Sequence, residues 1–415
     1  MARMSSPHVR RTIAGHGVLP RERPLSRALR ALGVAATVVL VATAGVVAYG
    51  YHDLASAFAE DAEDLGHPAP PDIAALVDDE GVDLLLTGID VCEWDSHEKF
   101  GKRCPDDRSR YGEDGRELDA GRNDVNLLVH VSPEPRRITA IAFPRDLRIP
   151  TPECDDGAGH VTAASTTRLI NEQYAAGGLA CVARTIDGIT ESHDPALGIE
   201  YAATVTWNGV IEITNAIGGV EVCVDEGIDD AQAGMLHLEP GPHTLAGEQA
   251  LAFLRSRYGV GDKGDLTRIS NQQVYMSALA RKLTSEGVLT DPATLLTLAR
   301  TTLRNVDPST SLANPVTLVQ IGLAVKDVPT SDITFVQYPV IEDPTNRNHV
   351  VPDDDAAAAM FRAIADNASL TPVPASPTAT DGPEPSDEPA PGSVVAAPGR
   401  SADDKSCAQG RGFGG

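Results

Sequence analysis

A run of 21 residues without a charged side chain, residues 31–51, constrains the topology of this 415-residue chain more than any other feature. As a helix it would be about 30 Å long, which is the thickness of one hydrocarbon core. Residues 1–30 carry seven arginines and one acidic residue, Glu22. Because positive charge favours the cytoplasmic side, we predict a cytoplasmic segment at 1–30, a transmembrane helix at 31–51 and an exported remainder. A cleaved signal peptide is the alternative, although its apolar region would be unusually long.

The exported part would be strongly acidic. The first 30 residues hold seven of the 34 basic residues but only one of the 59 acidic ones, and the whole chain has a formal charge of −25 at pH 7. A phosphate backbone would be repelled by such a surface, so general binding to nucleic acid is disfavoured. An acidic surface suits the divalent cations found outside a cell.

Export would also permit disulfides among the six cysteines. Two pairs bracket short loops and are predicted to be bonded: Cys92 with Cys104, and Cys154 with Cys181. The remaining two, Cys223 and Cys407, have no evident partner. A zinc site is the less favoured alternative, because the cysteines and histidines show no close ligand spacing.

Composition divides the exported part into three segments. Residues 52–80 are predicted to be a polar, acidic extracellular linker, and residues 81–370 a globular domain in which apolar strand patterns alternate with helical ones. This alternation indicates an α/β sheet covered by helices on both faces. Within it, 168–178 and 179–190 are predicted to be two successive helices divided by a Gly-Gly pair. Residues 371–415 are rich in proline, alanine and serine and are predicted to be a disordered tail.

The segment 119–150 is the centre of the candidate site. Two β-branched, apolar stretches, 125–131 and 138–143, flank a Ser-Pro-Glu-Pro turn at 132–135. This pattern predicts a β-hairpin. The start of its first strand and the end of its second would therefore be neighbours.

Charged residues stand at both of these strand ends. Arg122 and Asp124 precede the first strand and Arg145 and Asp146 follow the second, so the hairpin would gather them at one end of the sheet. A site for an anion and a metal ion is one interpretation. Surface salt bridges at strand ends are the other, and this stretch alone favours them.

Further candidates lie on either side of the hairpin. Asp90 comes just after a predicted buried strand at 82–87, where open α/β sheets place ligands, and a hydrophilic loop at 92–116 follows it.

Arg255 and Arg257 are two residues apart and would share a face of extended chain. Arg268 and Gln272 are one turn apart on a predicted helix at 264–283, so both could reach one ligand. Loop carbonyls are the alternative partners for this pair.

Seven motifs occur in the order found in the LytR-CpsA-Psr family, which the chain resembles from about Val82 to Asp366. They are GID at 88–90, GRND at 121–124, FPRD at 143–146, INEQYAAGG at 170–178, AIGGVEV at 216–222, LAGEQALAFLRSR at 245–257 and GDLTRISNQQ at 264–273. Two positions depart from the family pattern. Asn123 stands where the family usually has serine or threonine, and Asn271 where it often has arginine.

The resemblance implies a three-layer α-β-α sandwich around a mixed central sheet, with an apolar pocket for a lipid chain. It implies a Mg²⁺-dependent phosphotransferase, with Mn²⁺ as an alternative metal, that moves a glycopolymer from a polyprenyl-pyrophosphate lipid to peptidoglycan through a phosphodiester. The expected location is the cell membrane, with a single span and an extracellular catalytic domain.

The same resemblance implies roles for individual residues. Asp90 and Asp124 resemble the metal ligands, and either Asp124 or Asp146 would accept the proton of the sugar hydroxyl. The residues that resemble the pyrophosphate contacts are Arg122, Arg145, Arg255, Arg257, Arg268 and Gln272. Guanidinium groups bind phosphoryl oxygens in pairs and offset their charge. A hydrolase acting on the same lipid is one alternative. A non-catalytic regulator is the other, although the predicted cytoplasmic part has no DNA-binding pattern.

Overall fold

The computed structural model describes residues 62–66, 81–118, 121–157, 159–261, 263, 265–285, 292–373 and 395–413, together with seven isolated positions between Thr37 and Ala59. The chain forms two compact units, Met1–Asp53 and Leu54–Gly415. The predicted cytoplasmic segment lies outside the described residues, and so does the predicted span 31–51 apart from Thr37 and Gly45. No helix among the described residues has the length and apolar character needed to cross a membrane.

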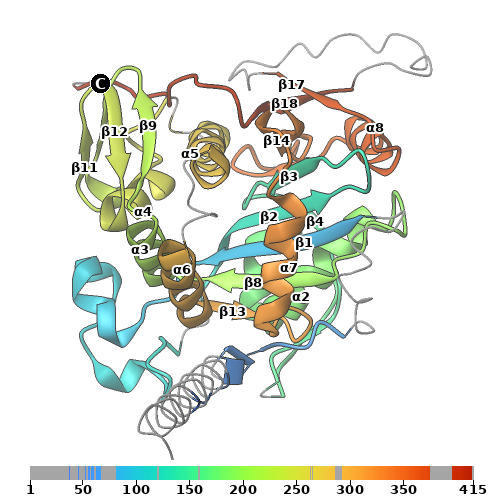
Figure 1. Cartoon of the computed structure of the whole chain (residues 1–415). Helices are drawn as coiled ribbons and strands as arrows, with labels where there is room; N and C mark the ends of the chain where they lie inside the picture. Colours follow the sequence, from blue (N-terminus) through green and yellow to red (C-terminus); the bar gives the residue numbers. More distant parts are fainter. Residues whose placement is uncertain are drawn as a thin grey trace, which may run out of the picture. The chain divides into compact units, whose positions relative to one another are not determined.

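An eight-stranded mixed sheet forms the centre of the second unit (Figure 1). Its strands, in spatial order, are β13 (Val306–Pro308), β8 (Tyr201–Val205), β1 (Val82–Ile89), β2 (Asn123–Val131), β3 (Ile138–Phe143), β14 (Ile333–Gln337), β18 (Val395–Ser401) and β17 (Leu370–Val373). β1 runs parallel to β8, and β3 runs parallel to β14. The mixed central sheet expected from the sequence is thus confirmed.

The predicted hairpin is also confirmed. β2 and β3 pair antiparallel from Asn126 opposite Phe143 to Val131 opposite Ile138. β1 pairs antiparallel with the other edge of β2. The carboxyl ends of β1 and β3 therefore share one edge of the sheet with the start of β2.

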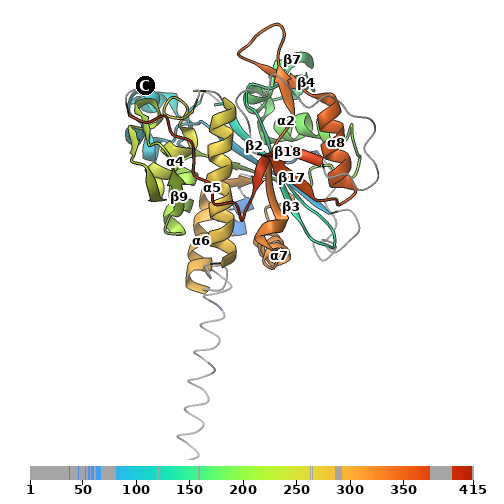
Figure 2. The same cartoon turned by 90° about the horizontal axis from the view of Figure 1, so that it is seen from above.

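Helices cover both faces of this sheet, because alternate side chains of each strand point to opposite faces. Leu85 and Leu128 pack in one core with α2 (Gln173–Thr190) and α8 (Asp354–Ala365). On the other face, Leu84 packs against α7 (Pro315–Val325), and Leu127 against α5 (Asp265–Ser285). Figure 2 shows α5 on one side of the sheet and α8 on the other.

A lobe beside the sheet has a core of its own, to which α5 contributes Val274 and Tyr275. It contains β9 (Val220–Val224), β10 (Ile228–Asp230), β11 (Leu236–Leu238), β12 (Gly241–Leu245) and α4 (Gly247–Arg255). Next to α4 is α3 (Trp207–Ala216), which also contacts α6 (Pro292–Asn305). The other described strands are β4 (Arg148–Thr151), β5 (Cys154–Asp155), β6 (Val161–Thr162), β7 (Ser165–Leu169), β15 (Val340–Glu342) and β16 (Val350–Pro352).

The prediction of a disordered tail from residue 371 is wrong for much of that segment. Residues 370–373 are β17, and residues 395–401 are β18, which lies between β14 and β17. Small residues suit this place, because a Cβ on Gly399 would collide with the backbone oxygen of Phe335. Residues 374–394 lie outside the described part of the chain.

The predicted helix at 168–178 is wrong at its start, although its predicted end at Gly177 and Gly178 is confirmed. Arg168 belongs to β7, and α2 begins at Gln173 and continues past two non-helical residues, Gly177 and Gly178. The N–H groups of Leu179 and Ala180, which follow Gly178, donate hydrogen bonds to the Glu63 carboxylate at 3.0 and 2.7 Å. An acceptor distant in sequence thus satisfies the donors that the helix break exposes.

A half-buried acidic group near the start of β1, Glu200, gives stability a pH dependence. Burial, together with the charge of Asp83, raises the pKa of Glu200 to about 8. The folded protein therefore keeps this proton between about pH 4.5 and pH 8, where the unfolded chain releases it, so the free energy of unfolding falls as the pH rises through this window. Glu200→Gln, which can still accept the Asp83 N–H, is expected to flatten that fall. Urea unfolding of the wild type and of Glu200→Gln at several pH values measures this. If the free energy of unfolding falls equally with pH in both proteins, the prediction is contradicted.

Candidate active site

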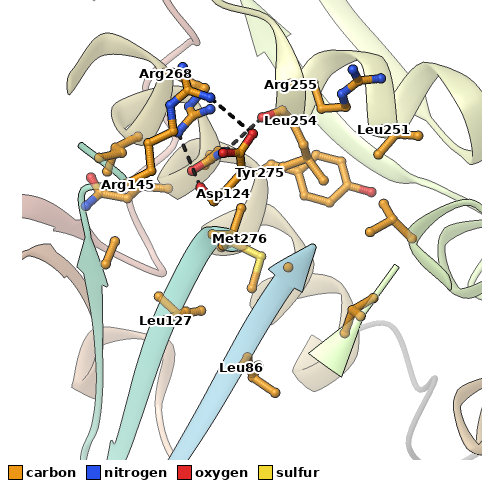
Figure 3. Close-up of a pocket in the computed structure, with 18 of the residues that line it drawn as sticks. Leu86, Asp124, Leu127, Arg145, Leu251, Leu254, Arg255, Arg268, Tyr275 and Met276 are labelled. Carbon is orange, nitrogen blue, oxygen red and sulfur yellow. Dashed lines mark hydrogen bonds and ion pairs between the residues drawn. The ribbon is translucent and has the colours of Figure 1, made fainter. Parts of the chain in front are cut away.

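A cavity of about 500 Å³ lies between the central sheet and the helices α3, α4 and α5. Most of its wall is apolar and includes Leu86, Leu127, Ala140, Leu251, Tyr275, Met276 and Leu279. Its polar lining includes Asp124, Arg145, Arg255, Arg257, Arg268 and Gln272. Figure 3 shows the charged groups gathered at one end, with Leu86, Leu127 and Met276 further in. The structure thus brings six of the predicted site residues to one cavity.

An irregularity in β2 places Asp124. Gly88 pairs with Val125 and Ile89 with Asn123, which leaves Asp124 as an extra residue in β2. Such bulges re-aim a side chain, and they are common beside active sites.

The buried amide of Asn123 holds the bulge in place. Its nitrogen donates to Asn126 Oδ1 and to the carbonyl of Ile170, both at 2.9 Å. Its oxygen accepts the N–H of Tyr174 at 3.1 Å. A hydroxyl has one hydrogen to donate, so serine or threonine could not make all three bonds.

Asp124 is paired with a predicted anion-binding arginine. Arg145 Nη1 lies 3.1 Å from Asp124 Oδ2, and Arg145 Nε lies 3.7 Å from Asp146 Oδ2. Arg268 donates to the backbone oxygen of Asp124 at 3.4 Å. Asp124 lines the cavity and Asp146 is not among its described lining residues, so the geometry favours Asp124 over Asp146 as the carboxylate facing a ligand.

Arg255 ends α4 and lies over the ring of Trp207, at 3.8 Å from its centroid. Arg103 lies 5.2 Å from the same ring. Burial and then repulsion from Arg103 lower the pKa of Arg255, but an arginine remains charged at neutral pH. Two guanidinium groups beside one indole concentrate positive charge, which favours an anionic ligand. No pattern in the sequence identifies Arg103 or Trp207 as residues of the site.

Asp230 is another residue of the site that the sequence did not point to. Its buried Oδ2 accepts hydrogen bonds from Ser256 Oγ and from the N–H groups of Arg257, Tyr258 and Gly259, at 2.8 to 3.1 Å. Burial raises the pKa of this carboxyl, but these hydrogen bonds outweigh burial and lower it below the ordinary value. An ionised Asp230 thus shapes the turn that carries Arg255 and Arg257.

Gln272 joins α5 to the end of α4. Its Nε2 donates to the carbonyl of Leu254 at 2.9 Å, so its partner is a backbone carbonyl at a helix end and not one in a loop. Because Leu254 directly precedes Arg255, this bond also positions that arginine.

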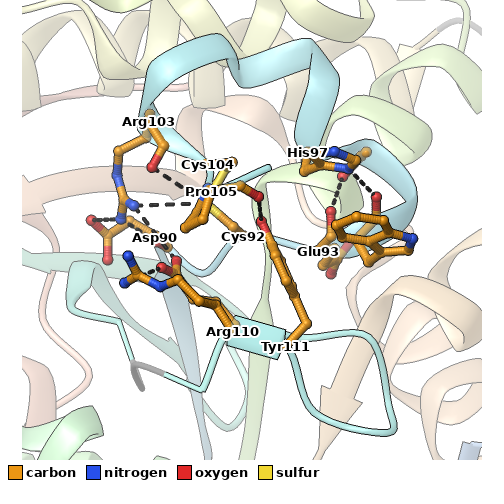
Figure 4. The surroundings of a disulfide bond; sticks show 12 residues. Asp90, Cys92, Glu93, His97, Arg103, Cys104, Pro105, Arg110 and Tyr111 are labelled. Atoms are coloured by element: carbon orange, nitrogen blue, oxygen red, sulfur yellow. Dashed lines mark hydrogen bonds and ion pairs between the residues drawn. A yellow bond between two sulfur atoms is a disulfide. The ribbon is translucent and has the colours of Figure 1, made fainter. Parts of the chain in front are cut away.

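Asp90 and Arg122 lie at the same sheet edge but are not among the described lining residues of the cavity. Arg103 contacts Asp90 twice, with Nη2 at 3.1 Å from Oδ2 and at 2.8 Å from the backbone oxygen. Asp90 Oδ1 accepts the N–H of Arg122 at 2.6 Å, while the Arg122 side chain is exposed. Figure 4 shows Arg103 reaching Asp90 beside the Cys92–Cys104 disulfide. The roles predicted for Asp90 and Arg122 stay predictions.

Both predicted disulfides are present, Cys92–Cys104 and Cys154–Cys181. The first closes the loop that carries Arg103, most of which is a 3-10 helix, η2 (Trp94–Arg103). The two cysteines without an evident partner, Cys223 and Cys407, form a third disulfide across 184 residues of sequence.

Protein side chains alone do not form a metal cage in the described part of the chain, where no three His, Cys, Asp or Glu side chains are grouped to hold an ion. Asp90 and Asp124 both act electrostatically on Arg255 and therefore lie in one neighbourhood. Mg²⁺ often binds through one or two carboxylates, with substrate phosphates and water completing its shell. The two aspartates fit that kind of site.

The chain is similar in sequence to known proteins. A model of the LytR_cpsA_psr family matches residues 51–365. Cell wall biosynthesis protein LcpA of Corynebacterium glutamicum is 28% identical over 239 residues, covering 52% of this chain and 43% of LcpA. The polyisoprenyl-teichoic acid–peptidoglycan teichoic acid transferase TagV of Bacillus subtilis is 27% identical over 220 residues, or 52% of each chain. The chain thus spans about half the length of these relatives.

A solved structure shows the same kind of fold. Protein gbs0355 from Streptococcus agalactiae superposes with a TM-score of 0.51 at 19% identity, covering 70% of this chain and 90% of that one.

Proposed function

The chain belongs to the LytR_cpsA_psr family, and from this premise we propose that it is a phosphotransferase that attaches a glycopolymer to peptidoglycan. The donor is a glycopolymer on a polyprenyl-pyrophosphate lipid, and the product is a phosphodiester. One relative is named as a transferase of polyisoprenyl-linked teichoic acid to peptidoglycan. The observation that carries the proposal is that one cavity has arginines at one end and mostly apolar side chains in the remainder.

The two parts of the cavity match the two parts of such a donor. Arg145, Arg255, Arg257 and Arg268 offer guanidinium groups for the pyrophosphate, and planar forks bind phosphoryl oxygens in pairs. The apolar wall between the sheet and α5 takes part of the prenyl chain, whose burial contributes affinity in proportion to its area. Phosphoryl transfer depends mainly on positioning and charge stabilisation, which this arrangement supplies.

The reaction transfers the phosphoryl group that bears the glycan. A sugar hydroxyl oxygen of peptidoglycan forms a new bond to this phosphorus, and the bridging P–O bond breaks, so polyprenyl phosphate leaves with its electron pair. Asp124 accepts the proton of the hydroxyl, because this carboxylate lines the cavity beside Arg145. The arginines offset the charge that develops on the phosphoryl oxygens.

Asp90 and Asp124 would hold Mg²⁺ or Mn²⁺, and a bound ion would supply charge neutralisation between protein and pyrophosphate. Arg103 now neutralises Asp90. Arg103 also lies beside Trp207, where it would add a further positive charge near the substrate.

The proposed location is the cell membrane, with residues 1–30 in the cytoplasm, one span at 31–51 and the catalytic domain outside the cell. The supporting feature is the uncharged run that follows an arginine-rich segment. Protease added to intact protoplasts should digest the domain and spare the first thirty residues.

Product analysis tests the proposed reaction and separates it from hydrolysis. Purified protein is incubated with a lipid-pyrophosphate-linked saccharide, with and without peptidoglycan fragments. We expect a phosphodiester-linked conjugate by mass spectrometry, and release of polyprenyl phosphate that depends on the acceptor. Equal release without an acceptor, and no conjugate, would identify a hydrolase instead.

A further inference from the structure

Residues 402–413, here called the C-terminal strap, connect the central sheet to the lobe. They follow β18 and lie outside residues 51–365, which match the family. Figure 1 shows this dark red segment running from β18 past α5 to the C-terminus beside β9 and β12. The strap begins at the sheet, where the N–H of the fully buried Ala402 donates to Ile333 at 2.8 Å.

The far end of the strap is fixed to the lobe. Cys407 is bonded to Cys223 in β9, and the N–H of Ala408 donates to the carbonyl of Cys223 at 2.7 Å. Ala408 is fully buried in the core of the lobe. The N–H of Gly410 donates to Asp225 Oδ1 at 2.7 Å. Both ends are therefore tethered, one to the sheet and one to the lobe.

The strap also binds α5, near each of its ends. The buried side chain of Asn271 makes two hydrogen bonds with the backbone of Gln409. Asn271 Nδ2 donates to the Gln409 carbonyl at 3.0 Å, and Asn271 Oδ1 accepts the Gln409 N–H at 2.8 Å. Nearly three turns further along α5, Arg281 donates to the carbonyls of Ala402 and Asp404, both at 2.6 Å. These bonds fix α5 along its length.

Other side chains of the same helix form a wall of the candidate active site. Arg268 and Gln272 belong to the charged end of the cavity, and Tyr275 and Met276 to its apolar wall. α5 therefore lies between the strap and the cavity, and any shift of the helix changes both parts of the cavity at once.

We propose that the C-terminal strap positions α5 and so sets the affinity of the cavity for the lipid pyrophosphate, with Asn271 as the positioning residue. This inference rests on the proposed function. It differs from simple tethering, because a tether would change stability without changing the binding of substrate to the folded protein.

Asn271→Ala tests the proposal, with Asn367→Ala as a matched control. Asn367 also bonds backbone groups, donating to the carbonyls of Pro133 and Pro135 at 3.2 Å, but it contacts neither the strap nor α5 among its described partners. KM for the lipid-pyrophosphate donor and kcat per folded molecule are measured well below both melting temperatures. We expect Asn271→Ala to raise KM about tenfold, the loss equivalent to one or two hydrogen bonds, and to change kcat little. Asn367→Ala should lower the melting temperature and leave KM unchanged.

Hydrogen exchange of residues 265–285 without substrate gives a readout that does not depend on activity. Faster exchange there is expected in Asn271→Ala and in the double variant Cys223→Ser/Cys407→Ser, and not in Asn367→Ala. An unchanged KM, or equal exchange in all variants, would overturn the proposal. A wild-type protein that transfers nothing would instead contradict the proposed function, and the exchange measurement would still decide whether the strap fixes α5.

Discussion

Replacing Asp124 with asparagine is expected to slow transfer by at least about 100-fold without unfolding the protein. Asparagine has nearly the same shape, so the bulge in β2 and the Arg268 bond to the backbone of residue 124 should survive. The charge facing Arg145 at 3.1 Å is lost, and with it the proposed proton acceptor and metal ligand. Transfer rate, melting temperature and binding of Mn²⁺ without lipid should be measured on the same preparation.

The control for this loss of charge is Asp327→Asn. Asp327 is 89% exposed and pairs only loosely with Lys326, at 3.7 Å. It should behave as wild type in all three measurements. If Asp124→Asn lowers the melting temperature while turnover per folded molecule is unchanged, Asp124 serves only a structural ion pair.

The part of the site that local pattern could predict is the hairpin. Its two β-branched stretches and the turn between them determine that Asp124 and Arg145 stand at the same edge, and the structure places these two side chains 3.1 Å apart. The arginines at 255, 257 and 268 come from elements whose approach to β2 depends on long-range packing. The family motifs identified them, whereas periodicity alone could not.

Long-range partners explain the features that the sequence analysis missed. Arg103 reaches Asp90 because a disulfide closes its loop, and Asp230 shapes a turn that lies more than twenty residues away in sequence. Glu63 lets α2 continue past Gly177 and Gly178. A proline- and alanine-rich tail lacks the pattern of a strand, yet β18 fits where β14 leaves no room for a side chain at Gly399.

The two departures from the family pattern have related explanations. Asn123 and Asn271 are both buried, and each uses both ends of its amide to bind backbone groups, at the bulge of β2 and at the C-terminal strap respectively. An asparagine offers a donor and an acceptor in one plane. Each asparagine therefore binds backbone groups that are distant in sequence and that only the folded structure brings near.

Replacing Arg255 is the second change for which we expect a large effect, in this case on substrate binding. Arg255→Ala is expected to weaken binding of the lipid pyrophosphate by roughly 1.5–3 kcal/mol, or about 10- to 150-fold in KM, because charged hydrogen bonds to phosphate are lost. Binding of Mn²⁺ should be nearly unchanged, since Arg255 is not a proposed metal ligand. Arg255→Lys should recover only part of the affinity, because lysine keeps the charge but lacks the planar fork that lies 3.8 Å from the Trp207 ring centroid.

Arg362→Ala, which removes an exposed arginine of α8, is the matched control and should leave KM unchanged. The order of KM among the wild type, Arg255→Lys and Arg255→Ala also shows whether the site needs the charge of Arg255 or the shape of its guanidinium group. If Arg255→Lys matches wild type, the site needs only a positive charge at this place. If Arg255→Ala matches wild type in KM and only its melting temperature falls, Arg255 serves to pack against Trp207, and the anion must be bound by the other arginines of the cavity.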